Sequence, residues 1–203
     1  MLLERESSLH FLQFGGILYL QYEIGGASMH RIAMEKLLKW KESKRRKPLI
    51  IEGARQVGKT WLMKEFGRTA YDSFVYFNFD EEDELKSIFE ANKNPHRIVE
   101  LLSLIAGEKI LPGKTLIIFD EIQECPKAIE SLKYFCEDAP EYHIVVAGSL
   151  LGVALHAGVS FPVGKVEFVR LYPLSFREFL MAAGREQYAQ LIKDKDCKMM
   201  QAF

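Results

Sequence analysis

The chain has 203 residues, of which 48% are hydrophobic and 27% are charged, and its formal net charge is −1. This length suits one domain of ordinary size with a buried core. The near-neutral charge excludes a global electrostatic attraction to nucleic acid or to an anionic membrane. Three cysteines without a C-x-x-C pair indicate reduced thiols in the cytoplasm, and five scattered histidines argue against a structural zinc site.

The stretch before Met29 is apolar and is interrupted by glycines. It is too short and too broken by polar residues for a membrane span, and it lacks the basic start of a signal peptide. We therefore expect no membrane association. We interpret Met29 as the true start of the protein and residues 1–28 as an N-terminal extension that is not part of the core.

The following residues alternate between helical and strand patterns. In chain order, the pattern predicts a helix over 29–44, a strand over 48–53, a helix over 59–67, a strand over 73–80, helices over 82–92 and 94–107, a strand over 114–122, a helix over 125–140, strands over 142–149 and 165–173, and a helix over 175–184. Asn94 is the expected cap of one helix, and Ser175 with Glu178 has the spacing of a capping box. Continuously apolar strands between helices indicate a mostly parallel sheet covered on both faces, which is an α/β fold.

The segment GARQVGKT, residues 53–60, fits the pattern G-x-x-x-x-G-K-[ST] between an apolar strand and a helix. The glycines let successive backbone N–H groups point inward, and the helix adds its positive end, so the loop can hold an anion. Lys59 would bring a positive charge to the β- and γ-phosphates, and the Thr60 hydroxyl is a hard oxygen ligand suited to Mg²⁺. The expected nucleotide-binding residues are Gly53, Ala54, Arg55, Gln56, Val57, Gly58, Lys59, Thr60 and Trp61.

A pair of carboxylates follows the apolar strand in LIIFDE, residues 116–121. Ligands of open α/β sheets bind at the carboxyl ends of the strands, where Asp120 and Glu121 are expected. Asp120 can hold Mg²⁺ through water or through Thr60, and Glu121 can orient and polarise a water for attack on the γ-phosphate. The two acidic residues therefore complement the loop that carries Lys59.

The glutamate also separates ATP hydrolysis from other chemistry of such loops. A small-molecule kinase takes its nucleophile from a second substrate and needs no base for water. A GTPase would show N-K-x-D, and NKNP at residues 92–95 lacks the aspartate. Ser149, after the fourth strand, could hydrogen-bond the attacking water or the γ-phosphate, or it could cap the next helix, and the residues leave both readings open.

Several stretches together resemble the prokaryotic AAA-type predicted ATPases that join this domain to a C-terminal domain of unknown function: IEGARQVGKTWL, IIFDEIQECP, VVAGSLLG and FPVGKVEFVRLYPLSFREFL. The chain is similar too to the archaeal ATPase branch of the additional-strand, catalytic-glutamate P-loop class. The resemblance covers residues 29–183 and implies a three-layer P-loop NTPase with a five-stranded sheet in the order 5-1-4-3-2. It also implies Walker A roles for residues 53–60, Walker B roles for Asp120 and Glu121, and a sensor role for Ser149.

Two features depart from this resemblance. Lys165 stands where related families place an arginine, and a lysine gives a point charge without the fork of a guanidinium. Arg170 is the other candidate for a finger-like role. The C-terminal domain is missing, so residues 184–203 are interpreted as the start of a truncated helix or linker, after an ATPase domain of residues 29–183.

We expect a cytoplasmic, Mg²⁺-dependent ATPase whose hydrolysis of ATP drives a conformational switch. One alternative is a nucleotide-binding interaction module with little turnover. Another is an ATP-dependent nucleic-acid motor, for which the basic run at residues 39–47 is the local support. Activity that rises with protein concentration would indicate self-association, in which a neighbouring subunit supplies a basic residue in trans. The sequence names no protein or nucleic-acid partner.

Overall fold

The computed structural model describes residues 10–14, 17–21, 23–24, 27–28, 31–81, 83–148 and 162–194. The chain divides into two compact units, one of residues 33–173 and one that combines residues 1–32 with residues 174–203. The loop of residues 53–60 and the acidic pair both belong to the larger unit.

The larger unit is built on a parallel five-stranded sheet with the order β6-β7-β8-β5-β9. Counted along the chain from β5, this is the predicted order 5-1-4-3-2, read from the other edge, so the prediction is confirmed. Strands β7 and β8 are buried over their whole length because helices cover both faces of the sheet. The strands are β5 (Leu49–Glu52), β6 (Ser73–Asn78), β7 (Thr115–Asp120), β8 (His143–Ala147) and β9 (Glu167–Arg170).

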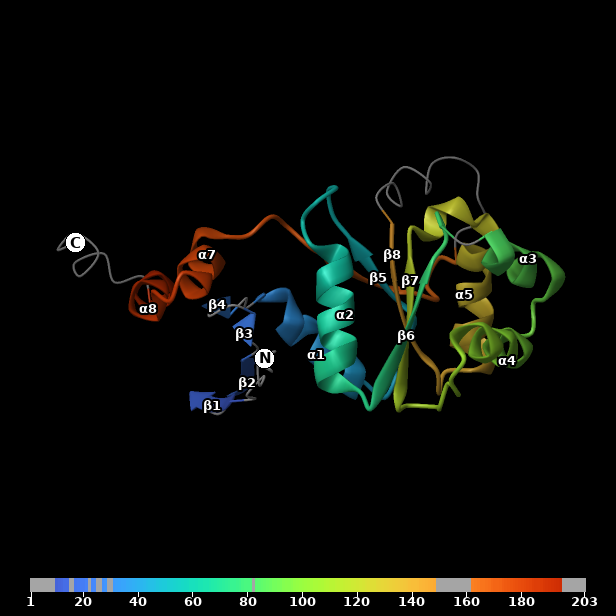
Figure 1. Cartoon of the computed structure of the whole chain (residues 1–203), viewed down its shortest axis with the longest axis horizontal. Helices are drawn as coiled ribbons and strands as arrows, with labels where there is room; N and C mark the ends of the chain where they lie inside the picture. The colour runs from blue at the N-terminus through green and yellow to red at the C-terminus, as the bar shows by residue number, and fades with distance from the viewer. Residues whose placement is uncertain are drawn as a thin grey trace, which may run out of the picture. The chain divides into compact units, whose positions relative to one another are not determined.

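Helices lie on both faces of this sheet, which gives three layers (Figure 1). One face is covered by α1 (Ala33–Glu42) and α2 (Lys59–Ala70), and the other by α3 (Asp83–Ala91), α4 (Pro95–Ala106) and α5 (Pro126–Asp138). Because successive strand residues point to opposite faces, alternate residues of β5 enter two separate cores. Leu49 and Ile51 pack with α1 and α2, whereas Ile50 packs with the core under α3, α4 and α5.

Helix ends follow the sequence signals with one exception. The side chain of Asn94 accepts hydrogen bonds from the backbone N–H groups of His96 and Arg97, and Gly107 ends α4 in a left-handed conformation, as predicted. The predicted end of the second helix at Gly67 is wrong, because α2 continues to Ala70. Gly67 is needed for packing instead, since a Cβ there would lie 2.7 Å from the side chain of Phe74.

The described residues of the smaller unit form two antiparallel strand pairs and two short helices. Strands β1 (His10–Phe14) and β2 (Ile17–Gln21) pair with each other, as do β3 (Glu23–Ile24) and β4 (Ala27–Ser28). The helices are α7 (Phe176–Ala182) and α8 (Glu186–Asp194), and α7 contacts both α8 and β4. The sequence analysis did not predict these strands.

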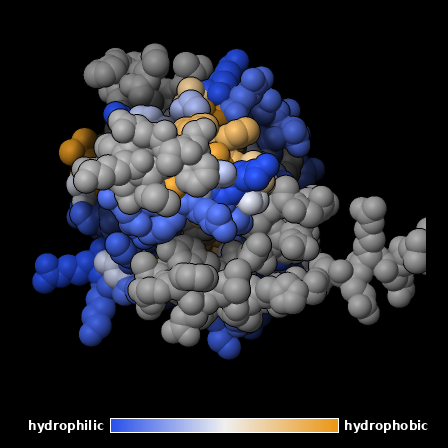
Figure 2. Space-filling view, turned by 90° about the vertical axis from the view of Figure 1, so that its left-hand side faces the viewer, coloured by the Kyte–Doolittle hydropathy of each residue, from blue (hydrophilic) through white to orange (hydrophobic). Residues whose placement is uncertain are grey.

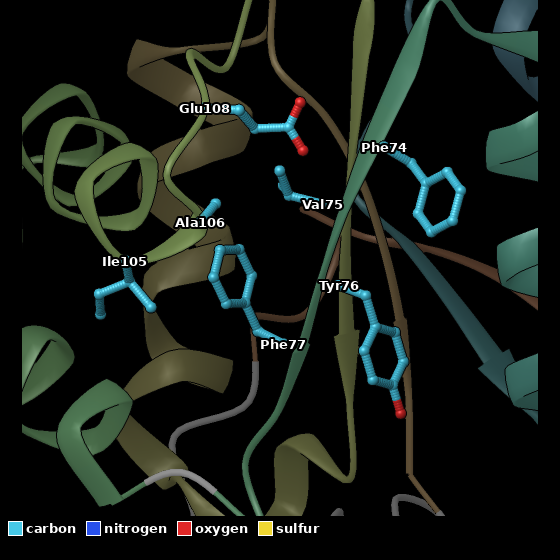
Figure 3. A pocket seen from close by; sticks show the side chains of 7 residues that line it. All are labelled: Phe74, Val75, Tyr76, Phe77, Ile105, Ala106 and Glu108. Carbon is cyan, nitrogen blue, oxygen red and sulfur yellow. The ribbon is translucent and has the colours of Figure 1, made fainter.

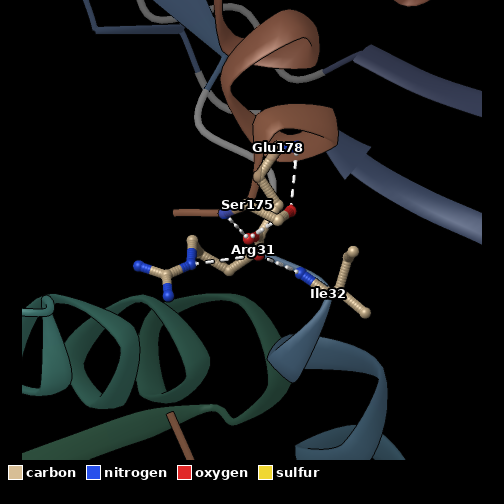
Figure 4. A network of polar contacts seen from close by, with 4 residues as sticks. All are labelled: Arg31, Ile32, Ser175 and Glu178. Carbon is tan, nitrogen blue, oxygen red and sulfur yellow. Dashed lines mark hydrogen bonds and ion pairs between the residues drawn. The ribbon is translucent and has the colours of Figure 1, made fainter. Parts of the chain in front are cut away.

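Glu178 is the polar centre of the smaller unit (Figure 4). Its Oε1 accepts hydrogen bonds from Arg31 Nε at 3.2 Å and from the backbone N–H of Ile32 at 2.9 Å. Its Oε2 accepts from the backbone N–H and the hydroxyl of Ser175, and Ser175 Oγ in turn accepts from the Glu178 N–H. The predicted capping box is therefore confirmed, and the same carboxylate ties α7 to the residues before α1.

The described surface is mainly hydrophilic in the view of Figure 2, where hydrophobic residues show in a small central area and at the left edge. Large apolar side chains that are exposed include Leu104, Val163 and Phe176. In the described part of the chain, every helix is too short or too polar to span a lipid bilayer.

Candidate functional site

The loop between β5 and α2 needs glycine at both of its ends, at Gly53 for a close approach and at Gly58 for a left-handed conformation. At Gly53 a Cβ atom would lie 2.4 Å from the carbonyl oxygen of Leu171, so only glycine fits against the chain that leaves β9. Gln56 (φ 62°) and Gly58 (φ 90°) are left-handed, which turns the chain sharply into the helix. In Figure 1 this loop lies at the edge of the sheet where the parallel strands have their carboxyl ends.

The first turn of α2 faces this loop and carries no acidic residue of its own. The helix begins at Lys59 after Gly58, and within the described residues no side chain caps it and no acidic residue lies in its first turn. The backbone N–H groups and the positive end of the helix dipole are therefore the groups that the protein offers to an anion here. This geometry fits a phosphate group.

Lys59 places a buried ammonium group inside the loop. Its side chain folds back so that Nζ donates to the carbonyl oxygens of Gly53 at 3.0 Å and Ala54 at 2.8 Å. An ammonium has three protons, so these two bonds leave one for a further acceptor. Only 7% of Lys59 is exposed, and a buried cation is a strong partner for a polyanion.

Thr60 and Asp120 meet at the same edge, as the sequence predicted. Thr60 Oγ1 lies 2.6 Å from Asp120 Oδ2, although the two residues come from α2 and β7. Because an ionised carboxylate can only accept, the hydroxyl donates and keeps its lone pairs available. Two hard oxygen groups at this distance fit Mg²⁺, which is commonly held by one or two protein groups together with phosphates and water. The described residues contain no cluster of three or more His, Cys, Asp or Glu side chains that could enclose a metal.

Glu121 leaves the end of β7 in a left-handed conformation (φ 48°, ψ 41°), just before the short 3-10 helix η1 (Ile122–Glu124). Such a conformation is uncommon for a residue with a side chain, and strain of this kind is often found at functional sites. Its Oε2 accepts a hydrogen bond from Gln123 Nε2 at 2.6 Å, and its backbone N–H donates to Asp120 Oδ1 at 3.1 Å. The backbone of Glu121 is thus hydrogen-bonded to Asp120, and its carboxylate is hydrogen-bonded to Gln123.

Tyr76 also reaches the site, and the sequence analysis missed it. Its hydroxyl donates to Asp120 Oδ2 at 3.1 Å from the neighbouring strand β6. Burial and then the charge of Asp120 raise the pKa of Tyr76 far above its usual value, so the hydroxyl stays protonated. The signal available in the sequence was its place in the strand predicted over 73–80, which the predicted sheet order puts beside the strand of the acidic pair.

Other predicted residues are distributed as follows. Val57 is buried in the core beside α2, Trp61 packs against the same core, and Arg55 and Gln56 are exposed. Ser149 lies outside the described residues, so its predicted role stays a prediction.

Lys165 and Arg170 lie at opposite ends of strand β9. Lys165 precedes β9, whose first residue, Glu167, pairs with the start of β5, and its ammonium forms an ion pair with Glu137 at 2.9 Å. The loop follows the other end of β5, so Lys165 is remote from it within one chain. Arg170 pairs in register with Glu52 directly before the loop, and the two side chains form an ion pair at 3.4 Å.

A shallow pocket of about 290 Å³ lies elsewhere, along the outer edge of β6 (Figure 3). It is lined by Phe74, Val75, Tyr76, Phe77, Ile105, Ala106 and Glu108. Glu108 is its only charged side chain, so it lacks the cations that a nucleotide requires. The convergence of loop, hydroxyl and carboxylates therefore marks the candidate site better than this pocket does.

Comparisons with known proteins show the family of this chain and support its fold. A family model for the AAA domain matches residues 45–180. Among solved structures, the chain is similar to a Walker-type ATPase of Pyrococcus abyssi, with a TM-score of 0.51 and 18% identity over 79% of this chain and 59% of that one. It is also similar to a structure of Drosophila ORC bound to AT-rich DNA and Cdc6, with a TM-score of 0.42 and 14% identity over 71% of this chain and 58% of that one. No curated protein matches the chain.

Proposed function

The chain belongs to the AAA domain family, and on this premise we propose that it binds ATP with Mg²⁺ and hydrolyses it to drive a conformational switch in a partner or a further domain. Family membership supports nucleotide binding and ATPase activity in general. The finer proposal is carried by one observation, the 2.6 Å contact between Thr60 and Asp120 beside the loop that holds Lys59. We assign this activity to residues 29–183.

The proposed mechanism assigns a role to the loop of residues 53–60, to Thr60, Asp120 and Glu121, and to Ser149. The N–H groups of residues 53–60 would bind the phosphates, and Lys59 would neutralise part of their charge. Thr60 and Asp120 would hold Mg²⁺, which when bound neutralises charge that develops on the phosphates. Glu121 would orient a water molecule and accept its proton, while Ser149 would hydrogen-bond that water or the γ-phosphate.

Binding and turnover can be separated with Lys59→Ala and Glu121→Gln. We expect Lys59→Ala to weaken ATP binding about 100-fold, because a charged hydrogen-bond donor worth roughly 3 kcal/mol is lost. Glu121→Gln should keep binding but lower phosphate release by about 10² to 10⁴, the usual contribution of a general base. Calorimetry and a phosphate-release assay measure the two effects.

The matched controls are Lys39→Ala on α1 and Glu90→Gln on α3, which change the same residue types at exposed positions. Both should behave like the wild-type protein. Equal phosphate release by wild type and Glu121→Gln would remove Glu121 as the base. Unchanged ATP affinity in Lys59→Ala would contradict the phosphate loop itself.

A nucleotide-binding module with little turnover is the second candidate. It is favoured by the hydrogen bond that holds Glu121 to Gln123 and by the distance of Lys165 from the loop within one chain. Tight ATP binding without phosphate release at any protein concentration would support this candidate. Release that rises with protein concentration would instead indicate self-association and a basic residue supplied in trans.

The structure offers less for a nucleic-acid motor. In the basic run of residues 39–47, Arg46 donates to the carbonyl oxygens of Lys41 and Ser43, and Lys47 Nζ donates to that of Gly164. These cations are turned toward their own chain, whereas Lys39, Lys44 and Arg45 of the run are exposed. Stimulation of ATPase activity by DNA that weakens steeply with salt would still establish this function.

A further inference from the structure

The buried carboxylate of Asp120 accepts hydrogen bonds from three parts of the chain. Only 3% of this residue is exposed, so its oxygens depend on hydrogen bonds from the protein. Oδ2 accepts from Thr60 in α2 and from Tyr76 in β6, and Oδ1 accepts from the backbone N–H of Glu121. Two hydroxyl groups thus converge on one oxygen atom.

Tyr76 is placed for this contact by the pairing of β6 with β7. In the parallel register Tyr76 lies opposite Ile118 and Asn78 lies opposite Asp120, so the long tyrosine side chain reaches diagonally toward the end of β7. Figure 3 shows the Tyr76 ring projecting from the face of β6 that is turned away from Ile105 and Glu108. This is the face covered by α2, from which Thr60 comes.

A lysine on the same helix holds the ring. Lys64 Nζ lies 3.5 Å from the centroid of the Tyr76 ring, which is the geometry of a cation–π contact. Since Lys64 and Thr60 are four residues apart in α2, they lie on the same face of that helix. The tyrosine is therefore fixed at its ring by one residue of α2, and its hydroxyl shares an acceptor with another.

We propose that Tyr76 is a positioning residue that orients the Asp120 carboxylate for the divalent-cation site it forms with Thr60. Thr60 is itself an expected ligand, so Tyr76 is the side-chain donor that can hold Asp120 without taking part in coordination. Groups that hydrogen-bond to metal ligands commonly contribute 10- to 100-fold to metal affinity. This inference rests on the proposed function, because it concerns the cation that accompanies ATP.

The test is the substitution Tyr76→Phe, which removes the hydroxyl and keeps the ring under Lys64. Calorimetry gives the dissociation constant of a non-hydrolysable ATP analogue twice, once with Mg²⁺ and once with EDTA. We expect Tyr76→Phe to reduce the improvement that Mg²⁺ brings by about 10-fold and to leave the constant in EDTA unchanged. Tyr71→Phe is the matched control, since it removes a hydroxyl that bonds His143 Nδ1 at 2.8 Å in the same unit.

The possible results distinguish failure of the role proposed for Tyr76 from failure of nucleotide binding itself. If Tyr76→Phe benefits from Mg²⁺ as much as wild type does, the inference is overturned, even if its melting temperature falls. Equal weakening with Mg²⁺ and with EDTA would likewise overturn it, because that describes a general structural role. If the wild-type protein binds no nucleotide under either condition, the proposed function fails and the inference fails with it.

Discussion

Charged side chains at the candidate site are held by groups from several parts of the chain. Lys59 is bonded by two carbonyl groups of its own loop, whereas the partners of Asp120 come from helix α2, strand β6 and the residue that follows β7. Glu121 is held by Gln123, whose own Oε1 is buried without a hydrogen-bond partner among the described residues. Leaving such an oxygen unsatisfied costs free energy, which lowers the stability of this part of the site.

Another buried titratable residue, His143, makes stability depend on pH. Burial, followed by the charges of Arg46 and Lys41, lowers the pKa of His143 from 6.5 to about 4. The unfolded chain therefore binds more protons than the folded chain between these values, and stability must fall as the pH falls through this window. The contribution is complete above pH 6.5 and is lost by about pH 4.

We predict that His143→Asn makes this loss smaller by on the order of 1 kcal/mol between pH 6.5 and pH 4.5. Asparagine has a side-chain amide that can still meet the Tyr71 hydroxyl but does not titrate. Urea unfolding at several pH values measures the difference. Parallel pH curves for the two proteins would show that His143 is not responsible.

At the level of elements, α2 links the phosphate loop to the edge of the sheet. Its first residues, Lys59 and Thr60, belong to the candidate site, and Gly67 near its other end packs against Phe74 of β6. The close approach at Gly67 therefore sets how near α2 lies to the strand that carries Tyr76. A change in this packing would be felt at both ends of the helix.

Gly67→Ala should therefore destabilise the protein by about 1–3 kcal/mol, the usual cost of overpacking. Within an ordinary helix the same change stabilises by roughly 1 kcal/mol, so the sign itself is informative. Phe74→Gly removes both atoms that the new Cβ would meet at 2.7 Å, the Cβ and Cγ of Phe74. In that background we expect Gly67→Ala to become neutral or stabilising, which a double-mutant cycle of unfolding free energies measures.

At the scale of the whole molecule, the smaller unit draws on both ends of the chain. Arg31 and Ile32 reach Glu178 through hydrogen bonds of 3.2 and 2.9 Å. Burial raises the pKa of Glu178, but hydrogen bonds from Ser175 and Ile32 outweigh it, so the net shift is downward. The residues just before α1 therefore have a structural role in holding Glu178.

Two truncations test the interpretation that residues 1–28 are not part of the core and that Arg31 and Ile32 are. Deleting residues 1–28 should change the unfolding free energy by less than about 0.5 kcal/mol, as for other changes outside the core. Deleting residues 1–32 should cost about 1–3 kcal/mol, because Glu178 then loses partners while buried. Thermal melts followed by circular dichroism compare them, and unfolding caused by the shorter deletion would refute the interpretation.

Local patterns alone determined the loop of residues 53–60, the acidic pair, most element boundaries and the caps of α4 and α7, because each depends on neighbours a few residues away. The resemblance supplied the strand order. Only the tertiary structure decided that Tyr76 reaches Asp120, that Gly67 is a packing residue rather than a helix end, and that Lys165 lies near the opposite end of β5 from the loop. These three features depend on strand register and on the distance between a helix and a strand, which are set by the packing of residues far apart in the sequence.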